Sequence, residues 1–158
     1  MFIYKTKKFI LNNGSECKLV LPDRKYAEDI YKVIVDERLR LAKYLPWVMD
    51  MKSVQDEEQF LEYSIEKIHK EEMMMFIILV DENVAGMIDL HNINRSSKRA
   101  EVGYWLSEKF EGYGIMTQAV DIIEKYSFNE LKLHKLQIRV HPENYKSASI
   151  PQRLGYFK

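Results

Sequence analysis

The sequence has only one cysteine, Cys17, no long apolar run and no net charge. A single cysteine cannot build a disulfide framework, which favours a reducing, cytoplasmic setting. No apolar run reaches the roughly 20 residues that span a bilayer, and the N-terminus lacks the apolar stretch of a signal peptide. The 24 basic and 24 acidic side chains cancel, which removes any general attraction to nucleic acid or an anionic membrane. We expect a cytoplasmic protein with neither of these partners.

What the sequence does contain is typical of one soluble domain. Its 158 residues are 46% apolar and 30% charged, with no repeats, low-complexity tracts or interdomain linker. We therefore predict a single domain over residues 1–158. Cys17 lies in a short apolar segment, where a buried strand thiol is expected; a nucleophilic role stays open, although no base can be assigned to it.

The N-terminal half predicts a strand followed by helices. Residues 17–21 form a short strand that stops at Pro22, and segments 2–4 and 9–11 are candidates for an earlier hairpin arm. Asp23 can cap a helix with apolar residues at helical spacing from Ala27 to Val35, and a second short helix is expected within 39–47. Ser53 and Asp56 have the spacing of a capping box before a helix with an apolar stripe at Phe60, Leu61, Ile65 and Ile68.

The second half predicts three consecutive strands and then a helix. Residues 73–80 are almost wholly apolar, as in a strand covered on both faces, and 84–93 and 100–106 complete an antiparallel meander. A helix follows Gly114, a further strand spans 136–140, and a last helix spans 144–154. The order favours an α+β (mixed α/β) fold, with helices packed on a largely antiparallel sheet.

A glycine-containing turn joins the third strand of this meander to the next helix. The first N–H groups of a helix have no partner within it, and the helix dipole adds partial positive charge there, which suits a phosphate or diphosphate. Gly112 and Gly114 would let the backbone approach such a ligand. The spacing alone also fits a plain strand-to-helix turn, since it lacks the third glycine of a dinucleotide fingerprint and the lysine of a P-loop.

Several longer segments resemble the GNAT acetyltransferase superfamily. They are Ala100–Leu106, Phe110–Thr117, Gly86–His91, Asn144–Ser147 and Arg153–Tyr156. They occur in the expected order, cover nearly the whole chain and are most similar to ribosomal-protein N-terminal alanine/serine acetyltransferases. The resemblance implies direct transfer of acetyl from acetyl-CoA to a primary amine, without a metal.

The resemblance also implies where acetyl-CoA binds. The diphosphate would lie on the turn amides, and the pantetheine arm would pair with the strand around Tyr104 and Leu106. The turn residues concerned are Gly112, Tyr113, Gly114, Ile115, Met116 and Thr117. Glu111 stands where the family often has Gln or Arg, and Tyr113 stands where the family often has a basic residue. Since both differences remove positive charge, the affinity for the diphosphate should depend on backbone amides.

Transfer to an amine requires a proton acceptor, directly or through water. Glu101 matches the recurrent glutamate of the family, although it could be a structural carboxylate on the sheet. His91 is a second candidate for the base, because the pKa of histidine lies in a suitable range. The alternative for His91 is a structural role at the end of a strand. The remaining histidines lack metal-ligand spacing.

Further site residues are implied by the resemblance. Ser147 would protonate the leaving thiolate and Asn144 would contact CoA, although both could simply cap a helix. Tyr44 and Trp47 would line the acceptor pocket, unless they pack in the core.

The chain stops where relatives continue into final strands, which leaves three explanations: a truncated chain, a short natural form, or strands from a partner in a homo-oligomer. A catalytically impaired module that binds CoA or a protein is the alternative function.

Overall fold

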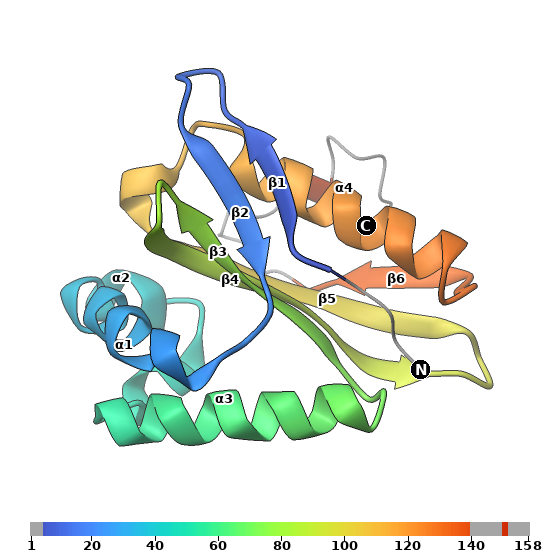
Figure 1. Cartoon of the computed structure of the whole chain (residues 1–158). Helices are drawn as coiled ribbons and strands as arrows, with labels where there is room; N and C mark the ends of the chain where they lie inside the picture. The colour runs from blue at the N-terminus through green and yellow to red at the C-terminus, as the bar shows by residue number, and fades with distance from the viewer. Residues whose placement is uncertain (1–4, 140–149, 152–158) are drawn as a thin grey trace.

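The computed structural model describes residues 5–139, 150 and 151. Its strands form one sheet in the order β1-β2-β3-β4-β5-β6 (Figure 1). Neighbours are antiparallel except β5 and β6, which are parallel. The strands are β1 Lys7–Ile10, β2 Glu16–Val20, β3 Met74–Val80, β4 Asn83–Asn94, β5 Arg99–Leu106 and β6 Lys135–Ile138. The predicted α+β fold with a largely antiparallel sheet is confirmed.

Helices cover both faces of this sheet, which gives three layers (Figure 1). α1, α2 and α3 pack on one face and α4 on the other, each over its own apolar cluster. Three short 3-10 helices, η1 to η3, connect these elements. The bounds are η1 Arg24–Tyr26, α1 Ala27–Asp36, α2 Arg38–Ala42, η2 Pro46–Asp50, α3 Val54–His69, η3 Glu108–Phe110 and α4 Ile115–Asn129.

β3 lies between the two clusters, and all seven of its residues are buried. Met74, Phe76 and Ile78 face the α4 side, while the alternate residues face α1 and α3. The prediction of a strand covered on both faces is confirmed. Cys17 is fully buried on the α4 side, where burial raises the pKa of its thiol to about 12, so the buried strand thiol is confirmed as well.

Two helix starts differ in detail from the sequence prediction. Ser53 caps α3 by accepting from the Asp56 amide at 3.1 Å, but the Asp56 carboxylate accepts from Lys52 rather than from Ser53. Asp23 caps η1, because a 3-10 turn is inserted before α1. The buried stripe of α3 also differs: Leu61 is buried as expected, and it is flanked by Glu57 and Ser64.

Some predictions fall on residues outside the described ranges. They include the strand segment 2–4 and most of the helix over 144–154, of which Ile150 and Pro151 are helical. The absence of final strands stays a prediction. Within residues 5–139, 150 and 151, no helix has both the length and the apolar character needed to cross a bilayer.

Candidate functional site

The turn before α4 is built on two glycines in the left-handed region. Gly112 has φ +88°, and Gly114, the N-cap of α4, has φ +74°. A Cβ at either position would meet nothing within 4 Å of the protein, so the backbone conformation, rather than crowding, favours glycine in this turn. The sequence signal for a glycine turn opening a helix is confirmed as local structure.

The amides of residues 112–117 donate to no protein group in the described part of the chain. The first bond of α4 runs from the Gln118 amide to the Gly114 carbonyl at 3.1 Å. Ile115 and Met116 bury their side chains in the core, so their backbone N–H groups are what they can offer a ligand. Unpartnered donors at the positive end of a 15-residue helix are suited to an anion such as a diphosphate.

Arg40, on α2, holds the segment that leads into this turn. Its guanidinium donates to the Leu106 carbonyl at 2.8 Å and to the Glu37 carboxylate at 2.7 Å, and it lies 3.3 Å from the Glu111 carboxylate. These contacts join α2 to the end of β5 and to the residue before Gly112. Glu111, where the family often has Gln or Arg, is therefore paired with a cation.

Glu37 completes this network from the end of α1. Ser107 donates its hydroxyl to Glu37 at 2.5 Å, and the Glu108 amide donates at 2.8 Å. Burial would raise the pKa of Glu37, but these two hydrogen bonds and Arg40 outweigh it, and the pKa is lowered. Glu37 is thus an ionised carboxylate that fixes η3 against α1.

β5 continues past the last residue of β6. Their parallel ladder ends where Val102 pairs with Ile138. Because the Ser107 amide donates across to Ala85 on the β4 side at 2.7 Å, alternation directs the backbone groups of Tyr104 and Leu106 to the opposite edge of β5. These two residues were predicted to pair with a pantetheine arm; the Leu106 carbonyl already accepts from Arg40.

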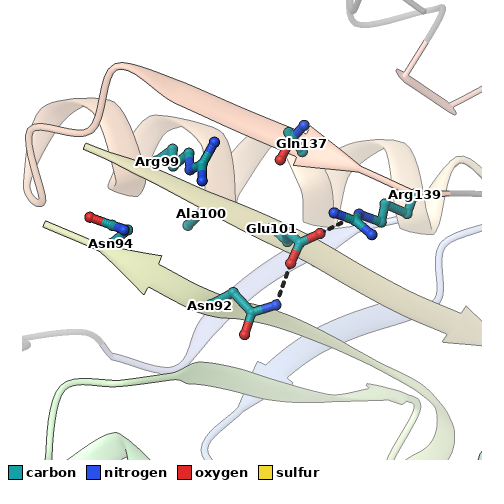
Figure 2. A pocket seen from close by; sticks show the side chains of 7 residues that line it. All are labelled: Asn92, Asn94, Arg99, Ala100, Glu101, Gln137 and Arg139. Carbon is teal, nitrogen blue, oxygen red and sulfur yellow. Dashed lines mark hydrogen bonds and ion pairs between the residues drawn. The ribbon is translucent and has the colours of Figure 1, made fainter. Parts of the chain in front are cut away.

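The two candidate bases, Glu101 and His91, are directly paired across β4 and β5. The Nε2 atom of His91 lies 3.8 Å from Oε2 of Glu101, and its Nδ1 atom lies 2.6 Å from Oδ1 of Asp89. Figure 2 shows Glu101 between Asn92, which donates its side-chain amide to Oε2, and Arg139, whose Nε lies 2.5 Å from Oε1. The side chain of Glu101 is 11% exposed and that of His91 is 37% exposed.

The surroundings move the two pKa values in opposite directions. The amide of Asn92, with the charges of Arg139 and His91, holds the pKa of Glu101 below its ordinary value. The hydrogen bond to Asp89, with the charges of Asp89 and Glu101, raises the pKa of His91 despite its partial burial. These shifts make His91 the group of the pair that accepts a proton more readily, and they favour the ionised form of Glu101.

A bulge between His91 and Asn94 brings Asn92 to Glu101. Asn92 has φ +48°, a left-handed conformation that asparagine tolerates better than most residues. Gly103 makes room for the Asp89–His91 pair, because a Cβ there would lie 3.2 Å from the Asp89 carboxylate and 3.3 Å from the imidazole. The bulge at Asn92 and the missing side chain at Gly103 therefore allow Asp89, His91 and Glu101 to lie close together.

The acceptor-side prediction concerns Tyr44 and Trp47. Val48 is the buried residue of η2, whereas Trp47 is 37% exposed and Tyr44 is half-buried. Neither packs in the two apolar clusters, so the alternative of core packing is wrong for both. Their role in binding an acceptor stays a prediction. Asn144 and Ser147 lie outside the described residues.

Sequence reasoning missed Asp89, Asn92, Arg139 and Arg40. The Asp89-x-His91 spacing was a readable signal, because alternate residues of a strand share a face. The other three depend on the bulge, on the β5–β6 pairing and on the packing of α2, which no local pattern encodes. In the described ranges, no group of three or more His, Cys, Asp or Glu side chains is placed to hold a metal ion.

Unpartnered backbone donors at the start of α4, which follows the end of β5, define the class of the site, one suited to an anionic group such as a phosphate. The model of the Acetyltransferase (GNAT) domain family matches residues 18–156, and the chain belongs to this family.

Relatives of known name agree with this membership. YdaF of Bacillus subtilis (strain 168), whose name proposes a ribosomal N-acetyltransferase, is 40% identical over 81 residues, 51% of this chain and 44% of YdaF. The ribosomal-protein-serine acetyltransferase of Escherichia coli (strain K12) is 24% identical over 131 residues, 83% of this chain and 73% of that protein. The match thus spans less than half of YdaF.

Among solved structures, the microcin C7 self-immunity acetyltransferase MccE, in complex with acetyl-CoA and AMP, superposes with a TM-score of 0.81. It is 28% identical, and the match covers 88% of this chain and 77% of MccE.

Proposed function

We propose that this chain is an acetyl-CoA-dependent N-acetyltransferase that acts on a primary amine. The observation that carries the proposal is the row of amides at residues 112–117, at the start of α4, which have no protein partner among the described residues. The amides offer a diphosphate site at the positive end of the helix. A relative of similar fold, MccE, binds acetyl-CoA.

In the proposed reaction, acetyl-CoA supplies the acetyl group as a thioester. Glu101 attracts the acceptor ammonium with its fixed negative charge. His91, whose pKa is raised by Asp89, accepts the proton that the amine must lose, directly or through water. The amine nitrogen then bonds to the acetyl carbon as the carbon–sulfur bond breaks. The nitrogen gives up its second proton in this step, and Ser147 is proposed to relay a proton to the departing sulfur, so that a neutral amide and a thiol result.

We propose a protein N-terminus as the acceptor, in preference to a free small amine. Support comes from the names of YdaF and of the E. coli relative, both of which refer to ribosomal acetylation. Trp47, exposed on η2, and Tyr44 offer aromatic surface for a peptide.

A second candidate is a module that binds CoA without turning it over. The observation in its favour is the acidic surroundings of Arg40, where Glu37, Glu108 and Glu111 outnumber the one arginine near the proposed diphosphate site. Repulsion from these carboxylates would weaken binding of a polyanion.

Calorimetry with acetyl-CoA, CoA and ATP, together with thiol release in the presence of amine acceptors, tests both candidates. Preference for ATP over CoA species would eliminate both, and CoA binding without thiol release would select the module. The buried Cys17 thiol should add little to a thiol assay on the native protein.

Within the same assay, Glu101→Gln should lower kcat/KM about 100-fold, because it removes the charge that attracts the ammonium and supports His91. Glu66→Gln, which breaks an exposed pair with Lys70 on α3, is the matched control and should behave like the parent chain. Equal rates for Glu101→Gln and the parent would remove Glu101 from the mechanism.

A further inference from the structure

A polar pocket with a cavity volume of about 410 Å³ opens beside Glu101 (Figure 2). β4, β5 and β6 all contribute to it. Its lining consists of Asn92, Asn94, Arg99, Ala100, Glu101, Gln137 and Arg139. Because Glu101 lies at its wall, the part of an acceptor that follows the reacting amine would occupy this space.

Most of the polar lining is already engaged. Asn92 and Arg139 both bind Glu101, and the side chain of Asn94 accepts from the Ser97 amide at 2.9 Å. By contrast, the side chains of Arg99 and Gln137 make no hydrogen bond or ion pair with the residues that the structure describes. These two side chains are available to a ligand, and one of them is a cation.

Arg99 stands at a defined separation from the reacting centre. Arg99 and Glu101 are alternate residues of β5 and share one face of the sheet. Two residues of a strand span about 6.6 Å, and an extended peptide advances by about the same distance in two residues. A peptide whose amine lies at Glu101 would therefore bring its second or third side chain to Arg99.

We propose that Arg99 determines specificity by binding an acidic side chain at the second or third residue of a peptide acceptor, with Gln137 as a neutral partner. The inference rests on the proposed acetyltransferase function. A guanidinium fork matches a carboxylate in a bidentate arrangement. The same positive charge repels the further ammonium groups that a polyamine carries beyond the reacting amine.

Peptides that share one N-terminal residue and carry Glu, Gln or Lys at the second or third position test this proposal, with spermidine as the polyamine. The parent chain should prefer Glu to Gln by roughly fivefold in kcat/KM, and Lys should be worse than Gln; the factor is modest because Arg99 is exposed. Arg99→Gln should abolish the preference and Arg99→Glu should invert it. Lys125→Gln removes a positive charge on α4 and should leave the preference unchanged.

Two outcomes separate the inference from the function on which it rests. Thiol release with equal rates for all three peptides, or a preference for spermidine, overturns the role of Arg99 and leaves the acetyltransferase intact. If no amine gives thiol release, the proposed reaction fails, and equilibrium binding of the same peptides by calorimetry still tests the pocket. Tighter binding of the Glu peptides that disappears in Arg99→Gln supports the role of Arg99, and equal dissociation constants refute it.

Discussion

At the scale of single residues, the candidate site is a row of three interacting side chains on two neighbouring strands: Asp89 and His91 on β4, and Glu101 on β5. Sequence pointed to Glu101 and His91 as alternatives, because each fits a base separately. Their pairing across β4 and β5 makes them one unit, in which protonation of either depends on the other. The choice between them could not be made from the sequence, since Asn92 reaches Glu101 through a bulge that no residue pattern announces.

The pH dependence of activity should report this unit. A base must be neutral to accept a proton, so kcat/KM should rise with pH through the pKa of His91, above its ordinary value of about 6.5. Asp89→Asn removes the hydrogen bond and the negative charge that raise this pKa, so the rise should move to lower pH. Asp121→Asn on α4 is the control for loss of a carboxylate. A rise at the same pH in Asp89→Asn and in the parent would show that His91 is not the titrating base.

At the scale of elements, the start of α4 could be predicted from the sequence, because two glycines between a strand and a helix indicate a turn with left-handed backbone angles. The β1 hairpin, the meander and the helices were readable for a similar reason, since their apolar periods are local. The contact of α2 with the turn before α4 could not be predicted, because Arg40 lies 71 residues before Glu111 in the chain.

Gly114→Ala tests the turn. An alanine forced to φ +74° should lower the free energy of unfolding by about 1 kcal/mol and disturb the aim of the amides, weakening CoA binding by roughly tenfold. Gly14→Ala is a matched control, because Gly14 also has a left-handed φ and open space around its Cα, but lies in the β1–β2 hairpin. Urea unfolding should show a similar loss for both variants, and calorimetry should show weaker CoA binding for Gly114→Ala alone. Unchanged CoA affinity in Gly114→Ala would count against the diphosphate site.

At the scale of the whole molecule, the sheet divides the interior into two apolar clusters, and the α1–α3 side contains a buried carboxyl group. Glu57 is 1% exposed on the stripe of α3 that also carries Leu61. Neither of its oxygens has a hydrogen-bond partner among the described residues, and burial raises its pKa to about 7. The sequence predicted an apolar stripe here but did not mark Glu57 as buried, because acidic residues are common in the first turn of a helix, where the helix dipole favours them.

Stability should therefore fall as pH rises from about 4.5 to 7. The folded chain favours the neutral carboxyl, so stabilisation present below the unfolded pKa is lost as the group ionises, by at most roughly 3 kcal/mol. Glu57→Gln should flatten this part of the profile in urea unfolding, whereas Glu66→Gln on the exposed side of α3 should keep it. An identical pH profile in Glu57→Gln and the parent would contradict the assignment.

The position of Arg40 has a consequence for the protein as a whole. One guanidinium ties α2 to the rim of the proposed coenzyme turn, and Tyr44 and Trp47 follow α2 directly in the chain. A shift of α2 would weaken the contacts that Arg40 makes with Glu111 and with the Leu106 carbonyl. In the proposed enzyme, the Arg40 side chain would therefore couple the acceptor side of the molecule to the coenzyme turn.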